Sequence, residues 1–575
     1  MVTSVGGFVD RPAIGTVRGW FVADRVARQV GEKLRVPSFS RIRAGSDPVR
    51  QGDLFGESHA KAWSRWLISL RRGPASTVRA RMGFQQLVRP CVRAPGLHAP
   101  ARDSSRRGSS PVTEERSRQS KGLFVRTFGC QMNRYDSERL AELLRPEGYE
   151  PVADEGQADL VVINTCSVRE KAEQKAFSYL GRLKAVKRRR PEVVIAIAGC
   201  VAQQNGASLL DRVPHLDLVV GTHGLAQVPR MLVHLAETGK RQCFVDFICD
   251  FGDKSDGARR PQSPAVSAYV TIMRGCDNHC TYCIVPQVRG RECSRPVREI
   301  VGEVASLVAS GVKEVVLLGQ NVNSYGKGLP GSADFAALLH EVAKVPGVMR
   351  IRFTTSHPKD LLPALMGCFA EIEPLCPHIH LPVQSGSDRT LARMRRGYTS
   401  EHFLRLAEEV RRVRSDVAIS SDVIVGFPGE TEADFHDTMA LLEAVRFDAL
   451  FSFMYSDRPG TPARRLRGKV PHEVKLQRLQ SLLCLQERIT LERNEAQVGT
   501  ITPILVEGPS QAGEGQLSGR SPQNRVVNFA GQPDLVGREA PVLISAACPH
   551  SLQGVVAIEG HHPLPTVKET SCCGK

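Results

Sequence analysis

The stretch from Arg274 to Pro296 reads RGCDNHCTYCIVPQVRGRECSRP, and it places three cysteines within eight residues. Cys276, Cys280 and Cys283 are separated by three residues and then by two, and Cys293 follows ten residues later. Short cysteine runs of this kind bind metals or iron–sulfur clusters. The run AYVTIMRG just before them is apolar, and it predicts a β-strand that leads directly into the cysteines.

From this strand onward, strands and helices alternate six times. The apolar, β-branched runs that predict strands lie at 268–275, 313–321, 350–356, 378–385, 417–427 and 451–456. Helical patterns such as PVREIVGEVASLVASG and SEHFLRLAEEVRRV lie between them. Six such repeats predict a partial (β/α)6 barrel, whose active face lies at the carboxyl ends of its strands.

Three further cysteines end equivalent strands in an earlier part of the chain. The run LFVRTFGC ends at Cys130, DLVVINTC ends at Cys166 and VVIAIAGC ends at Cys200, with helical patterns between them. This order predicts a doubly wound parallel sheet of the α/β class, in which ligands bind beyond the carboxyl ends of the strands. We therefore expect the three thiols to converge as one ligand set. The alternative is that each cysteine is a small packing residue.

The thiols at Cys276, Cys280 and Cys283 fit either zinc or an iron–sulfur cluster. Structural zinc takes four Cys or His ligands, and His279 or Cys293 could supply the fourth. A second closely spaced pair is missing, however, so an iron–sulfur cube fits the loop better. Three thiolates hold three irons and leave the fourth iron open to a substrate. We expect Cys293 to be a surface or packing residue that binds no metal.

The net charge of +17 is concentrated at the amino-terminal end of the 575-residue chain. Residues 1–111 hold 20 Arg and Lys but 7 Asp and Glu, in short runs broken by Gly, Pro and Ser. We expect 1–120 to be a mostly disordered basic extension, arising from a mis-set start site or serving as an organelle leader. The sequence shows no signal peptide and no apolar run of about 18 residues, so we expect a reducing compartment and no membrane partner.

The loop CDNHCTYC resembles the signature of the radical S-adenosylmethionine (SAM) superfamily. RTFGCQMNRYDSE, INTCSVREKAEQK and AGCVAQQ resemble the amino-terminal domain of the methylthiotransferases. LLGQNVNSYG and HLPVQSGSDRTLARMRRGYT resemble their tRNA-2-methylthio-N6-dimethylallyladenosine synthase branch. The resemblance runs from about Phe124 to about Gly560. It implies a methylthiotransferase domain at 121–240, a radical SAM core at 262–497, a TRAM domain with a small OB-like β-barrel at 498–562, and a tail at 563–575.

This resemblance implies two [4Fe-4S] clusters and the cofactor SAM. The radical cluster, which binds SAM, carries over to Cys276, Cys280 and Cys283, and an auxiliary cluster carries over to Cys130, Cys166 and Cys200. The implied reaction inserts sulfur and a methyl group at C2 of N6-dimethylallyladenosine 37 in tRNA. The C2 hydrogen is not acidic, so no side-chain base could remove it, and no catalytic residue beyond the cluster ligands is implied.

The implied partners are the tRNA anticodon loop, an electron donor such as flavodoxin or ferredoxin, and a sulfur donor that the sequence does not identify. We expect a monomer in the bacterial cytoplasm, with the mitochondrial matrix as the alternative. The alternative functions are a sister methylthiotransferase, acting on threonylcarbamoyladenosine 37 or a ribosomal-protein aspartate, and a non-catalytic RNA-binding relative. Five arginines are candidate phosphate contacts, although a solvated turn or an exposed helix face explains them equally well: Arg393, Arg395, Arg396, Arg520 and Arg525.

Overall fold

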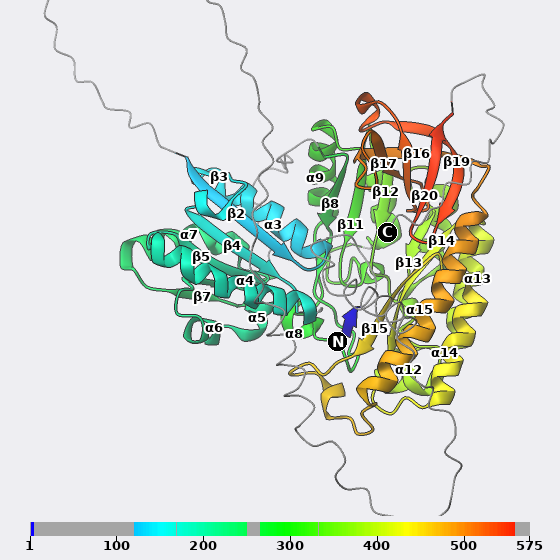
Figure 1. Ribbon diagram of the computed structural model, residues 1–575, viewed down its shortest axis with the longest axis horizontal. Helices are drawn as coiled ribbons and strands as arrows, with labels where there is room; N and C mark the ends of the chain where they lie inside the picture. The colour runs from blue at the N-terminus through cyan, green and yellow to red at the C-terminus, as the bar shows by residue number, and fades with distance from the viewer. Residues whose placement is uncertain (1, 5–119, 168–169, 250–264, 332, 558–575) are drawn as a thin grey trace, which may run out of the picture. The chain divides into compact units, whose positions relative to one another are not determined.

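The computed structural model describes residues 2–4, 120–167, 170–249, 265–331 and 333–557 (Figure 1). The extension predicted at 1–120 and the tail predicted at 563–575 lie outside these residues, apart from strand β1 (Val2–Ser4) and residue 120. Strand β1 pairs antiparallel with β15 (Ala449–Tyr455). None of the described helices is both long enough and apolar enough to cross a membrane.

The amino-terminal unit is a six-stranded sheet in which every neighbouring pair of strands is parallel, in the order β3-β2-β4-β5-β6-β7. The predicted strands are β2 (Lys121–Phe128), β4 (Leu160–Thr165) and β5 (Val194–Gly199). The three strands that the sequence did not predict have three residues each, too few for a clear pattern. They are β3 (Tyr149–Pro151), β6 (Leu218–Val220) and β7 (Gln242–Phe244), the last lying beyond residue 240.

Helices cover both faces of this sheet, which confirms the doubly wound prediction (Figure 1). Helices α3 (Gln131–Leu144) and α7 (Val228–Thr238) pack on one apolar face. Helices α4 (Glu170–Arg189), α5 (Cys200–Asn205) and α6 (Ser208–Arg212) pack on the other. Strand β4 is buried at all six residues, because a parallel strand covered on both faces meets no water.

The second unit contains the six predicted β/α repeats, in two three-stranded parallel ladders. One ladder holds β8 (Ser267–Thr271), β11 (Glu314–Leu318) and β12 (Arg350–Phe353). The other holds β13 (His378–His380), β14 (Ala418–Val425) and β15. A single bridge between Ile351 and Leu375 joins the edge of the first ladder to the segment before β13. The partial-barrel prediction is confirmed. A short antiparallel pair, β9 (Met273–Arg274) with β10 (Cys293–Ser294), closes the cysteine loop.

The barrel helices form because apolar residues recur at helical spacing behind a polar cap. Helix α13 (Ser400–Val413) buries Phe403, Leu406, Ala407 and Val410 on one face, and the Thr399 hydroxyl accepts a hydrogen bond from the His402 amide at 3.2 Å. The remaining helices of this unit are α8 (Val285–Arg289), α9 (Val297–Ala309), α10 (Phe335–Ala343), α11 (Pro363–Glu371), α12 (Asp388–Met394), α14 (Glu432–Val445) and α15 (His472–Glu495).

The third unit is a closed barrel with the strand order β16-β17-β18-β20-β19, which confirms the OB-like prediction. Its apolar centre includes Ile504, Val506, Leu517, Val527 and Phe529. The strands are β16 (Ile501–Pro509), β17 (Gln516–Arg520), β18 (Val526–Ala530), β19 (Glu539–Cys548) and β20 (Ser551–Val556).

Two buried arginines on one face of β12 bind the small barrel. Arg350 donates to the carbonyl oxygens of Arg520 and Pro503 at 2.6 and 2.9 Å. Arg352 donates to the carbonyl oxygens of Ser521 and Pro522 at 2.8 and 2.7 Å, and its Nε lies 2.6 Å from the carboxylate of Glu314. These contacts attach the third unit to the second.

We expect Arg352→Met to lower the free energy of unfolding by about 3 kcal/mol, because it leaves the buried Glu314 carboxylate without its cation. Urea denaturation followed by circular dichroism measures the loss. The matched control is Lys344→Ala, which breaks an exposed ion pair with Glu341 and should cost less than about 1 kcal/mol. Equal effects of the two substitutions would contradict this account of the interface.

Candidate cluster-binding sites

The structure brings Cys130, Cys166 and Cys200 together at one edge of the amino-terminal sheet. Cys130 follows β2 and caps the start of α3, Cys166 follows β4, and Cys200 is the first residue after β5. These three strands are neighbours, so their carboxyl ends lie side by side. The thiol of Cys166 forms hydrogen bonds with those of both Cys130 and Cys200. We call these three residues the amino-terminal triad.

Two buried asparagines fix the backbone around this triad. The side chain of Asn133 lies 3.3 Å from the Cys130 sulfur and donates to Asn164 Oδ1 at 2.9 Å. Asn164 donates in return to the Asn133 carbonyl at 2.8 Å and to the Ser137 hydroxyl at 2.9 Å. This network joins the end of β4 to the first turn of α3. Asn133 was not predicted from the sequence, in which the available signal is its place three residues after Cys130, the spacing of a capping box.

The turn between β5 and α5 passes so close to Asn164 and Thr165 that position 199 must be glycine. Gly199 has φ of +89° and ψ of −156°, a conformation that only glycine adopts without strain. A Cβ atom there would lie 2.4 Å from Asn164 Oδ1 and 2.7 Å from the Thr165 carbonyl oxygen. The sharp turn between β5 and α5 therefore depends on the missing side chain.

Two thiols of the amino-terminal triad have a lowered pKa, and the third has a raised pKa. Hydrogen bonding from Cys166, together with the positive charge of Arg289, lowers the pKa of Cys130 to about 6 and that of Cys200 to about 7. The same hydrogen bonds raise the pKa of Cys166 well above its usual value. Cys130 and Cys200 therefore favour the thiolate, which is the form of cysteine that binds metals.

Cys276, Cys280 and Cys283 form a second triad on the loop between β9 and α8, and we call it the loop triad. The Cys276 amide donates to the Gly290 carbonyl at 3.2 Å, and the Cys283 amide donates to the Cys280 carbonyl at 3.1 Å. Burial raises the pKa of Cys276 to about 11 and that of Cys283 to about 12. Iron binding at this loop must therefore displace thiol protons.

A buried arginine contacts the loop triad. Arg396 Nη1 lies 3.4 Å from the Cys280 sulfur, and Nη2 donates to the Pro382 carbonyl at 2.8 Å. The exposed-face alternative for Arg396 is therefore wrong, because only 5% of this residue is exposed. Arg525 is also paired within the protein, at 2.5 Å from the Asp448 carboxylate, while Arg520 pairs with Glu507 at 3.0 Å.

One short helix connects the two triads. Ile284, which precedes α8, and Val288 within it form an apolar cluster with Cys200, and Cys283 packs against that cluster. The Thr222 hydroxyl donates to the Val288 carbonyl at 2.7 Å, and His223 Nε2 lies 3.0 Å from the Arg289 carbonyl oxygen. The amino-terminal unit thus holds the helix that follows the loop triad.

The donor chemistry of both triads fits a [4Fe-4S] cluster. Each supplies three thiols, which are the ligands of such clusters, from side chains that are buried or half-buried. Among the described residues, no group of three or more His, Cys, Asp or Glu side chains is arranged to hold a single metal ion. His279 is exposed. Cys293 is buried, as expected of a packing residue, and it also forms a disulfide with Cys249 that was not predicted from the sequence.

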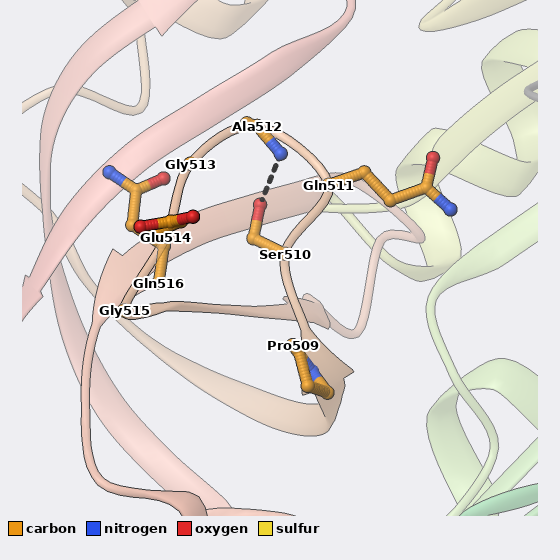
Figure 2. A pocket seen from close by; sticks show the side chains of 8 residues that line it. All are labelled: Pro509, Ser510, Gln511, Ala512, Gly513, Glu514, Gly515 and Gln516. Atoms are coloured by element: carbon orange, nitrogen blue, oxygen red, sulfur yellow. Dashed lines mark hydrogen bonds between the residues drawn. The ribbon is translucent and has the colours of Figure 1, made fainter. Parts of the chain in front are cut away.

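A pocket of about 450 Å³ lies at the turn between β16 and β17 and has no part in either triad. Residues Pro509–Gln516 line it, and the Ala512 amide donates to the Ser510 hydroxyl at 3.0 Å (Figure 2). It is formed by one loop that contains no thiol, so we assign it no catalytic role.

Three family profiles match the chain in sequence order. The uncharacterized protein family UPF0004 matches residues 122–221, the radical SAM superfamily matches 270–442, and the TRAM domain matches 495–557. The amino-terminal triad falls within the first match and the loop triad within the second.

Curated relatives match most of the chain and nearly their whole own length. The tRNA-2-methylthio-N(6)-dimethylallyladenosine synthase of Geobacter metallireducens is 52% identical over 436 residues, which cover 76% of this chain and 98% of the relative. The protein of the same name from Syntrophobacter fumaroxidans is 51% identical over 432 residues, which cover 75% and 95%.

Solved structures are similar at lower identity. The radical SAM methyltransferase TsrM from Kitasatospora setae aligns with a TM-score of 0.46 and 14% identity, covering 69% of this chain and 82% of its own. The cobalamin-dependent SAM radical enzyme OxsB aligns with a TM-score of 0.44 and 12% identity, covering 64% and 56%.

We expect Gly199→Ala to lower the free energy of unfolding by at least about 2 kcal/mol, because the new methyl group meets Asn164 and strains the backbone. Chemical denaturation of the protein before iron is added measures this directly. Gly181→Ala is the control, since Gly181 lies in α4 with open space around its Cα, and alanine favours helix there. A Gly199→Ala protein as stable as the control would refute this description of the turn.

Proposed function

This chain belongs to the tRNA-2-methylthio-N(6)-dimethylallyladenosine synthase family, and we propose that it adds a methylthio group to C2 of N6-dimethylallyladenosine 37 in tRNA. It is a radical SAM enzyme, a class that uses SAM and a [4Fe-4S] cluster. The observation that carries the proposal is the presence of two separate three-thiol groups, one at the carboxyl ends of three parallel strands and the other on the loop between β9 and α8.

The loop triad is the proposed ligand set for the cluster that binds SAM. Cys276, Cys280 and Cys283 would hold this cluster, which together with SAM would supply the radical chemistry needed at the C2–H bond of the adenine ring. The chain's own contribution is burial and charge. Cys276 and Cys280 are less than one-tenth exposed, and Arg396 places a positive charge against Cys280.

The amino-terminal triad is the proposed ligand set for a second [4Fe-4S] cluster that presents the sulfur to be inserted. Three thiols from three strands leave one iron of a cube without a protein ligand. Asn133 and Asn164 hold the strand ends in place, and α8 keeps this triad next to the loop triad.

The proposed partner is tRNA, and the TRAM barrel would help to bind it. Chemistry on a base of the anticodon loop also requires that base to be unstacked. The protein is further proposed to act as a monomer in the bacterial cytoplasm, with an electron donor such as flavodoxin or ferredoxin and a separate sulfur donor. In that reducing compartment Cys249 and Cys293 would be two thiols.

We expect anaerobically purified protein to hold about eight iron atoms per chain, in two clusters of four. Replacing all three cysteines of either triad by alanine should leave about four, because the two sites use separate ligands. Iron and sulfide analysis measures the content. Cys484→Ala is the control, since this thiol is exposed on α15 and belongs to neither triad. Complete iron loss in both triple variants would contradict independent sites, and zinc in place of iron would contradict the proposal.

Deleting the gene should remove 2-methylthio-N6-dimethylallyladenosine from cellular tRNA while its unmethylthiolated precursor accumulates. Mass spectrometry of digested tRNA measures both nucleosides. The wild-type gene should restore the product, and a Cys166→Ala gene should restore less than about 1% of it, because the second cluster loses a ligand. Loss of a methylthiolated threonylcarbamoyladenosine instead would identify the sister activity and overturn the proposed substrate.

A further inference from the structure

Arg289, the last residue of α8, is a buried cation beside the amino-terminal triad, although it belongs to the radical SAM unit. We propose that Arg289 is a positioning residue whose charge favours the reduced state of the amino-terminal cluster and helps that site retain iron. The inference rests on the proposed function, because it requires a cluster at Cys130, Cys166 and Cys200.

The position of Arg289 is fixed by contacts with the amino-terminal unit. Its Nη2 lies 2.8 Å from the carboxylate of Asp136 on α3, and 3% and 2% of the two side chains are exposed. Its own carbonyl oxygen lies 3.0 Å from His223 Nε2. Because both the guanidinium and the backbone of Arg289 are held by these contacts, the side chain cannot turn out to solvent. Its positive charge therefore stays next to Asp136.

One nitrogen of the Arg289 guanidinium, Nη1, is available to donate a hydrogen bond to a cluster at the triad. Its Nη1 is buried and has no partner with hydrogen-bond geometry in the part of the chain that the structure describes. A buried N–H of a charged group is costly when it lacks an acceptor. The neighbouring residue Val288 packs against Cys200, and Asp136 lies on the helix that Cys130 caps, so the guanidinium lies beside the triad. A sulfur atom of a bound cluster could accept a hydrogen bond from Arg289 Nη1.

A nearby positive charge has a defined effect on an iron–sulfur cluster. Reduction adds one negative charge to the cluster, and a fixed cation stabilises the more negative state, so the reduction potential rises. Burial strengthens this effect, because water does not screen the charge. Replacing Arg289 with a neutral residue removes this cation and leaves the buried Asp136 carboxylate without its partner, and both changes should lower the potential of this cluster.

The experiment uses the full chain with Cys276, Cys280 and Cys283 replaced by alanine, so that any remaining cluster belongs to the amino-terminal triad. In this background, Arg289→Gln should shift the equilibrium against the reduced state at least tenfold, or about 59 mV toward negative potential for one electron. Titration followed by electron paramagnetic resonance measures the midpoint. Arg289→Lys, which keeps the charge, should restore at least half of the shift.

Arg291→Gln is the matched control, because Arg291 lies two residues away with 92% of its side chain exposed. Its midpoint should equal that of the parent. An unchanged midpoint in Arg289→Gln with full iron content would overturn the inference. Equal iron loss in Arg289→Gln and Arg289→Lys would also overturn the inference, because the charge would then not be the cause. Iron loss in Arg289→Gln alone would support the inference. A parent protein without iron would instead overturn the proposed second cluster.

Discussion

The short helix α8 is the junction on which the arrangement of the two triads depends. Its chain enters directly from Cys283 of the loop triad, and its apolar residues pack against Cys200 of the amino-terminal triad. Contacts from Thr222, His223 and Asp136 hold it from the other side. A rigid connection of this kind lets two sites built by separate sheets keep a constant separation, which sequential chemistry at one substrate atom requires.

The two triads are built differently and therefore have different electrostatics. Three thiols from three strands lie within hydrogen-bonding reach of one another at the amino-terminal triad, and the cation beside it favours thiolates. The three thiols of the loop triad come from one loop, where burial favours the protonated form of Cys276 and Cys283. Each triad has one buried arginine near a sulfur, Arg289 in the first case and Arg396 in the second.

Most of the fold could be predicted from the sequence, and so could the meeting of Cys130, Cys166 and Cys200 at one sheet edge, because apolar runs that stop at a cysteine are a local pattern. That the six cysteines bind clusters stays a prediction. The supporting residues could not. Arg289 and Asp136 are 153 residues apart, and nothing in either segment names the other as its partner. Arg525 looks like a phosphate contact in sequence, but the fold places it against Asp448. The strands β3, β6 and β7 were missed because three residues are too few to show a period.

The most direct test of the central claim is the magnetic interaction between the two clusters. Electron paramagnetic resonance of the fully reduced wild-type protein should show a spectrum broadened by coupling between neighbouring paramagnets. That spectrum should differ from the sum of the spectra of the two variants that each retain one triad. A wild-type spectrum equal to that sum would mean that the clusters lie far apart, and it would contradict the junction formed by α8.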